Sequence, residues 1–366
     1  MDKIYTYTLT EPLKTTNGGN CRWGLAQKGQ KKYFIKELLS PVYPMDDCGL
    51  SEAVIKRKRQ GCRKFEQRQT EIYTLLNQNS NGALHRIEEF FRHGSRYYVV
   101  TEQIESLPDG MIADLRFSQE ERERVCYVLL HALAGMHKAG LIHGDIKLDN
   151  VLFYRTSQGC VSAKIIDFED AFRTEESPEP GEEIRGDQIY LSPEAFRLMT
   201  GESLALTQAI DVYALGLVLY QILSGRKQIM EGQEYTYPFE ALINGKELVL
   251  NWDGIPQKFR DCIRKMLRAV PEERPSLSSV LRELRGESTE ETAEEKEPEK
   301  EDRPEPIPEA HDPKKTDTAA PAEPPGERRG SARVVNIEGQ KLYISMGKGP
   351  KGKAKNSAFL ENAGDL

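Results

Sequence analysis

The sequence lacks the features that mark secreted and membrane proteins. Its six cysteines are scattered, without the paired spacing of a disulfide framework or a zinc site. The longest apolar runs, 125–133 and 214–223, are too short to cross a membrane, and the first residues alternate in polarity, unlike a signal peptide. We therefore expect a soluble, cytoplasmic protein with no membrane partner.

Positive charge is not concentrated in the way that nucleic-acid binding requires. The 366 residues carry a formal net charge of -7, and residues 287–312 hold twelve Asp or Glu against three Lys or Arg. The remainder is only slightly basic, so we expect no nucleic-acid partner. The length leaves room for one large domain, or two, with appendages.

The most informative stretch is the polar motif HGDIKLDN at residues 143–150, followed by an apolar run that ends in Asp167. An Asp, a Lys two residues later and an Asn five residues later resemble the catalytic loop of protein kinases, and Asp167 resembles their metal ligand. The resemblance implies a phosphotransferase that uses ATP and Mg²⁺. It implies Asp145 as the base that orients the attacking hydroxyl and Lys147 as the charge that balances the transferred phosphate. Asn150 and Asp167 would then hold magnesium.

The beginning of the chain extends the resemblance. Residues 3–10 alternate as a strand does and lead to a glycine turn at Gly18 and Gly19, after which residues 32–36 predict another strand. The kinase family's third glycine is missing here. The resemblance implies that the backbone at Gly18 and Gly19 approaches the phosphates and that Lys36 holds the α and β phosphates.

A helix is predicted after Ser51, with a basic first half. Kinases place a glutamate on this helix to pair with the strand lysine, and both Glu66 and Glu71 are candidates that the sequence does not separate. A second hairpin is predicted over 87–104. There the resemblance implies that the backbone from Glu102 to Ile104 binds the adenine base.

The next helix has clear boundary signals. Ser118 and Glu121 have the spacing of a capping box, and Gly140 marks the end of a helix that runs to about Ala139. His137 lies on the apolar stripe of this helix, so we interpret it as a core histidine and not as a catalyst.

Two rivals share the central motif. The HGD and IDFEDA strings also resemble aminoglycoside and choline-type phosphotransferases, which phosphorylate small molecules, and a catalytically inactive nucleotide-binding scaffold is the third alternative. Residues 186–194 favour protein kinases, because they resemble the segment that builds the peptide platform of that family. We expect Glu194 of this segment to form an ion pair with Arg274. Lys147 after Asp145 is similar to serine/threonine kinases.

Two positions depart from the family pattern. Gly144 stands where most members have an arginine that pairs with a phosphorylated activation loop, so we expect loop phosphorylation not to switch this protein on. Glu169 replaces the glycine of the metal motif, which predicts a more fixed metal-ligand loop. The acidic side chains between 167 and 194 favour basic protein substrates.

The sequence thus predicts an α+β, two-lobed protein-kinase-like fold over residues 1–286. The small β-rich N-lobe covers about 1–103, and the larger helical C-lobe covers about 104–286. Residues 287–332 have the composition of an acidic, proline-rich disordered linker. The basic tail 333–366 alternates around a Glu-Gly turn, which is typical of a short hairpin, although its composition favours disorder. This tail is a candidate for docking a partner, and Thr289, Thr292, Thr316 and Thr318 of the linker are candidates for self-phosphorylation.

Overall fold

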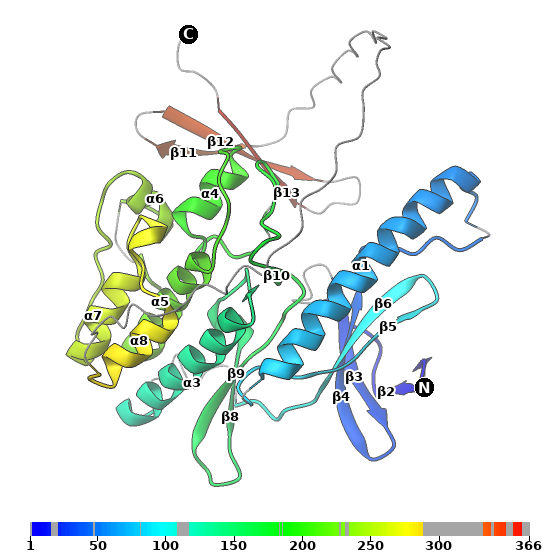
Figure 1. Ribbon diagram of the computed structural model, residues 1–366, viewed down its shortest axis with the longest axis horizontal. Helices are drawn as coiled ribbons and strands as arrows, with labels where there is room; N and C mark the ends of the chain where they lie inside the picture. The colour runs from blue at the N-terminus through cyan, green and yellow to red at the C-terminus, as the bar shows by residue number, and fades with distance from the viewer. Residues whose placement is uncertain are drawn as a thin grey trace, which may run out of the picture. The chain divides into compact units, whose positions relative to one another are not determined.

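The computed structural model describes residues 2–15, 21–46, 48–80, 82–107, 117–182, 184, 186–226, 228–230 and 234–287, with the strands at 332–337, 340–348 and 354–360. The predicted glycine turn at Gly18 and Gly19 lies outside these residues. The chain divides into a compact unit spanning Met1–Glu287 and a second unit that contains most of the remainder. The first unit has the predicted β-rich N-lobe and helical C-lobe (Figure 1).

The N-lobe is a six-stranded sheet with one long helix. The strands are β1 (Lys3–Ile4), β2 (Tyr7–Leu9), β3 (Cys21–Lys28), β4 (Lys31–Leu38), β5 (Ile87–His93) and β6 (Arg96–Glu102), in the spatial order β1-β2-β3-β4-β6-β5. Neighbouring strands are antiparallel. Helix α1 (Glu52–Asn79) begins where the sequence predicts it, and Ile72 and Leu76 on its inner side are buried.

The predicted strand over residues 3–10 is interrupted. Tyr5 has a positive φ of 55°, and β1 and β2 pair on either side of it, with Ile4 opposite Tyr7. The turn leaves Tyr5 exposed while Tyr7 and Leu9 are buried in the sheet. Because positive φ is uncommon outside Gly, Asn and Asp, Tyr5 carries no sequence signal for a turn, and the prediction of one continuous strand is wrong.

The C-lobe is organised around α3 (Gln119–Lys138) and α5 (Ala209–Ser224). Ser118 and Glu121 form the predicted capping box of α3, and Gly140, with φ 73°, follows its end. Residues of α5 are buried from Ile210 to Leu223, so this helix forms the centre of the lobe. The described residues of the lobe also form four shorter helices: α4 (Pro193–Met199), α6 (Pro238–Ile243), α7 (Gln257–Met266) and α8 (Leu277–Leu284).

Short elements between α3 and α4 place the predicted catalytic residues. Strand β7 (Leu141–Ile142) pairs with β10 (Phe172–Arg173), and β8 (Val151–Arg155) pairs with β9 (Val161–Ile165). A single 3₁₀ turn, Leu148–Asn150, lies between β7 and β8. The loop that follows β7 and the loop that follows β9 are therefore held by two small antiparallel pairs.

In the second unit, the described residues form three strands, β11 (Ala332–Ile337), β12 (Gln340–Lys348) and β13 (Ala354–Leu360), in that spatial order. Strands β11 and β12 flank the Glu-Gly pair where the sequence favours a hairpin, and β12 pairs antiparallel with β13, which the sequence did not predict. The linker threonines proposed for self-phosphorylation, Thr289, Thr292, Thr316 and Thr318, lie outside the described residues. Across the described parts of the chain, helices are all too short or too polar to cross a membrane.

Candidate active site

The loop from His143 to Asn150 is anchored by one buried carboxylate of the C-lobe core. Asp211 of α5 accepts hydrogen bonds from the backbone N–H groups of His143 at 2.8 Å and Gly144 at 3.0 Å. Its Oδ2 also lies 3.0 Å from Nε2 of His137. Burial alone would raise the pKa of Asp211, but the hydrogen bond and charge of His137, with support from His143, outweigh burial and lower it. His137 therefore has the structural role predicted for it.

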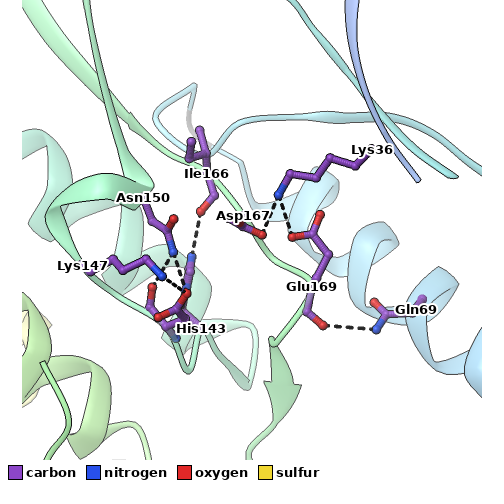
Figure 2. A network of polar contacts seen from close by, with 9 residues as sticks. Lys36, Gln69, His143, Lys147, Asn150, Ile166, Asp167 and Glu169 are labelled. Atoms are coloured by element: carbon purple, nitrogen blue, oxygen red, sulfur yellow. Dashed lines mark hydrogen bonds and ion pairs between the residues drawn. The ribbon is translucent and has the colours of Figure 1, made fainter. Parts of the chain in front are cut away.

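His143 connects the catalytic loop to the segment that carries Asp167. Its buried ring lies with Nε2 3.1 Å from the carbonyl oxygen of Ile166, and it packs against Phe168 with ring centroids 5.3 Å apart (Figure 2). The backbone N–H of Ile166 donates to the carbonyl of Asn150 at 3.0 Å. These bonds hold Asn150 and Asp167, the two predicted magnesium ligands, on adjoining segments.

Asp145 is the centre of a polar cluster that contains the other catalytic candidates. Lys147 donates from Nζ to Oδ2 of Asp145 at 2.7 Å. Asn150 donates from Nδ2 to the same oxygen at 2.9 Å and to the Asp145 carbonyl at 2.8 Å. Two donors therefore fix the carboxylate, and the structure brings together all three residues that the sequence motif predicts.

Gly144 occupies a position that suits glycine. Its φ is 79°, and an added Cβ would lie 3.1 Å from the carbonyl oxygen of Asp170 and 3.3 Å from the ring of Phe172. Positive φ is strained for residues with a Cβ, and the neighbouring backbone leaves little space for one. Gly144, which stands where the family has an arginine, therefore packs tightly against the segment that follows Asp167.

Lys36, at the predicted place on β4, reaches across to the C-lobe. Its Nζ lies 2.7 Å from Oδ1 of Asp167 and 2.9 Å from Oε2 of Glu169 (Figure 2). Asp167 has a φ of 70°, a left-handed conformation that aspartate tolerates better than most residues. Such strain is found where the surrounding contacts over-determine the backbone, as at functional sites.

The acidic partner of Lys36 differs from the prediction. Neither glutamate proposed on α1 contacts the lysine: Glu66 accepts from Tyr97 Oη at 2.7 Å, and Glu71 accepts from Gln67 at 3.0 Å. The reason is helical phase, because the α1 side chain that faces the site is Gln69, whose Nε2 lies 3.5 Å from the Glu169 carbonyl. The prediction that Glu66 or Glu71 holds Lys36 is therefore wrong for this structure, in which Glu169 contacts it.

The oxygen donors fit a magnesium ion. Asn150 directs its Nδ2 at Asp145, which leaves its amide oxygen without a described hydrogen bond, and Asp167 uses only Oδ1 with Lys36. Magnesium prefers a few hard oxygen ligands from the protein and takes the rest from nucleotide and water. No cluster of three or more His, Cys, Asp or Glu suited to a metal occurs among the described residues.

The predicted adenine-binding segment leaves the end of β6. The carbonyl oxygen of Glu102 lies 2.9 Å from Nε2 of His85, and the backbone N–H of Gln103 donates to the backbone carbonyl oxygen of Lys32 at 3.1 Å. Ile104 follows, beyond the strand. A carbonyl oxygen has two lone pairs, so the His85 contact leaves capacity at Glu102 for a second donor such as an adenine amino group.

A pocket opens beside Asp145, the predicted catalytic base. It is lined by Asp145 and Gly144 of the catalytic loop, by Gly186 and Tyr190, and by Ala214 of α5, among others. The predicted ion pair fixes the segment 186–194 that borders this pocket. Arg274 donates from two nitrogens to Glu194 at 2.6 and 2.9 Å. Both side chains of this pair are buried.

These features define the class of protein. A β-rich lobe carries a lysine to Asp167, the predicted metal ligand, and a helical lobe carries the Asp145, Lys147 and Asn150 cluster and the Glu194–Arg274 pair. The family model for the protein kinase domain matches residues 51–284. The chain belongs to the protein kinase family.

Three relatives are kinases by name, and two of these names specify a serine/threonine-protein kinase. The chain is 28% identical over 224 residues to ribosomal protein S6 kinase alpha-6 of Mus musculus, covering 58% of this chain and 28% of the relative. It is 31% identical over 183 residues to a calcium and calcium/calmodulin-dependent serine/threonine-protein kinase of Pisum sativum, covering 49% and 33%. It is 27% identical over 221 residues to the ovarian-specific serine/threonine-protein kinase Lok of Drosophila melanogaster, covering 57% and 44%. The chain thus spans less than half of each relative.

Proposed function

We propose that this protein is an ATP- and Mg²⁺-dependent serine/threonine protein kinase, which transfers the γ-phosphoryl group to hydroxyl groups of proteins. The observation that supports the proposal most strongly is the ion pair between Lys36 and Asp167, together with the Asp145 cluster. Phosphoryl transfer needs positioning and charge neutralisation more than covalent chemistry, and these groups supply both.

The roles follow from the contacts. Asp145, held by Lys147 and Asn150, would orient the acceptor hydroxyl and accept its proton, while Lys147 would balance charge on the transferred phosphoryl group. Asn150 and Asp167 would hold Mg²⁺, which neutralises the phosphates when bound. Lys36 would bind the α and β phosphates from the N-lobe side.

The test is transfer of labelled phosphate from ATP with Mg²⁺ to the protein itself, to a generic basic protein and to an aminoglycoside. We expect label on protein, and we expect Asp145→Asn, which keeps the shape but not the base, to lower transfer by about 10²- to 10⁴-fold. Label on the aminoglycoside alone would assign the protein to the small-molecule phosphotransferases. Binding of ATP without any transfer would make it a scaffold.

A protein acceptor is favoured over a small molecule by the platform segment. Tyr190 in this segment donates to Gln221 of α5 at 2.7 Å, and Glu194 is held by Arg274. The segment therefore forms a fixed wall of the pocket next to Asp145, where an extended peptide can place its hydroxyl.

We further propose that basic peptides are preferred. Glu179 and Glu182 are exposed in the segment between Asp167 and Glu194, whereas Glu175 pairs with Arg173 and Glu176 lies 3.0 Å from Arg68. Among the described residues, the carboxylates of Glu179 and Glu182 form no ion pair, and their negative charge attracts cations. Rates on matched basic and acidic peptides at low salt test this preference, and equal rates would refute it.

Localisation and partners beyond the acceptor also belong to the proposal. Cytoplasmic residence is supported by the cysteine pattern, and cell fractionation with an antibody against the chain tests it. Docking of a partner by residues 333–366 is tested by whether a chain shortened after residue 287 loses binding to proteins that the full chain captures while it keeps transfer to a generic acceptor. Mass spectrometry after incubation with ATP tests self-phosphorylation.

A further inference from the structure

Lys36 lies between two carboxylates of one short segment. Asp167 and Glu169 are two residues apart, and their oxygens lie 2.7 and 2.9 Å from the ammonium nitrogen. The side chains of Lys36 and Glu169 are 15% and 19% exposed, so solvent screens this ion pair less than it would a surface pair. Glu169 thereby connects the C-lobe loop to strand β4 of the N-lobe.

Helix α1 presents an amide, and not a carboxylate, to the backbone of Glu169. Gln69 is 2% exposed, and its Nε2 lies within 3.5 Å of the Glu169 backbone carbonyl. Its Oε1 is buried without a hydrogen-bond partner. A neutral amide does not attract an ammonium group as a carboxylate does, and Glu66 and Glu71 of α1 have other hydrogen-bond partners, Tyr97 and Gln67. The negative charge that holds the lysine is therefore located on the metal-ligand loop.

We propose that Glu169 is the positioning residue that holds Lys36 for the nucleotide phosphates, and that Gln69 replaces the usual helix glutamate at the facing position. This inference rests on the proposed ATP-dependent function. A lysine ammonium has three N–H donors, and the two carboxylates accept two of them. The third donor is left for a phosphate oxygen.

Glu169 also protects the metal ligand from competition. Without it, Asp167 is the acidic group that the structure places against Lys36, and the same carboxylate is the predicted magnesium ligand. Because Glu169 neutralises part of the positive charge of Lys36, Asp167 keeps more of its own negative charge available to the metal. Because one loop carries both groups, a shift of α1 does not by itself remove the carboxylate that holds Lys36.

The first experiment compares three variants of the full chain by nucleotide binding and by steady-state kinetics with varied ATP. We expect Glu169→Gln, which keeps the shape, to lower kcat/KM for ATP by about 10- to 100-fold, as expected when a charged hydrogen bond is lost. Glu71→Gln removes the rival glutamate of α1 and should change kcat/KM less than about twofold. Glu202→Gln, whose carboxylate lies 4.0 Å from Arg197 at the surface, controls for loss of charge.

The second experiment is a charge transfer between the two positions. Gln69→Glu in the Glu169→Gln background returns a carboxylate to the site from the helix side, and we expect at least a tenfold recovery of kcat/KM. If Glu169 had a purely structural role, Gln69→Glu would not restore kcat/KM. Glu169→Gln would then also not weaken nucleotide binding while leaving thermal stability unchanged. Wild-type kinetics in Glu169→Gln, or a loss in Glu71→Gln alone, would overturn the proposal.

Failure of the proposed function can be told apart from failure of this inference. If the wild-type chain binds Mg²⁺-ATP but transfers no phosphate, the kinase proposal fails. The affinity for Mg²⁺-ATP then still decides the present inference: weaker binding by Glu169→Gln with recovery by Gln69→Glu supports it, and equal binding by all variants overturns it.

Discussion

Arg274 offers the sharpest test of how the C-lobe is held together. Its side chain is fully buried and makes a two-pronged ion pair with Glu194. The guanidinium also donates to the backbone carbonyls of Arg268, Ala209 and Ala269 at 2.8, 2.9 and 3.2 Å. It lies 4.9 Å from the ring centroid of Tyr213. Replacement by methionine keeps much of the volume but removes every donor.

The magnitude follows from the group that remains. In Arg274→Met, the Glu194 carboxylate stays buried without its cation, and breaking a buried pair in this way costs about 3 to 5 kcal/mol. The second change Glu194→Gln removes that stranded charge. We therefore expect the double variant to be more stable than Arg274→Met alone, although the three carbonyl groups lose their donor in both.

The assay is chemical denaturation of the full chain followed by far-ultraviolet circular dichroism, with the free energy of unfolding compared among variants. The matched control is Arg197→Met, because Arg197 is half-exposed and lies 4.0 Å from Glu202; its cost should stay below about 1 kcal/mol. A loss of less than about 1 kcal/mol in Arg274→Met, or a double variant less stable than the single one, would refute the reasoning.

Three further changes have defined outcomes. Gly144→Ala should cost more stability in thermal unfolding than Gly140→Ala: both positions have positive φ, a cost of about 1–2 kcal/mol, but only Gly144 also meets close neighbours. Equal losses would show that the contacts with Asp170 and Phe172 are relieved freely. Asp211 has a lowered pKa when folded, so its stabilisation is complete above the unfolded value near 4 and lost as pH falls through the folded pKa. The stability advantage of the wild type over Asp211→Asn should therefore shrink below about pH 4, and a constant advantage in urea titrations at pH 3 to 7 would contradict it. Ser118→Ala removes the cap of α3 and should cost about 1 kcal/mol, whereas no change in the denaturation midpoint would show that the cap is dispensable.

The catalytic loop was predictable because its information is local. Asp145, Lys147 and Asn150 lie within six residues, and the structure brings them into one hydrogen-bonded cluster. The capping box of α3 is local in the same sense. The ion pair between Glu194 and Arg274 spans 80 residues, yet it was predicted because both positions belong to motifs of the family.

The partner of Lys36 was not predictable in this way. Glu169 lies 133 residues from the lysine. Choosing it over Glu66 or Glu71 requires knowing how α1 is oriented about its own axis, which the sequence does not give. The weak signal was Glu169, the glutamate directly after Asp-Phe. From the sequence we predicted only that this glutamate makes the loop more fixed. The broken first strand escaped prediction for another reason, since Tyr5 adopts a turn conformation that its residue type rarely takes.

The bonds around Asp211 have a further consequence for catalysis. One core carboxylate accepts from two successive backbone N–H groups of the catalytic loop, and His143 in that loop reaches the residue before Asp167. The relative positions of Asp145, the proposed base, and Asp167, the proposed metal ligand, are thus set when the helical lobe folds. Little of this geometry remains to be arranged when substrate arrives, so the barrier to transfer carries a small reorganisation cost. We therefore expect core stability and phosphoryl transfer to be coupled through Asp211, a residue of the lobe's core.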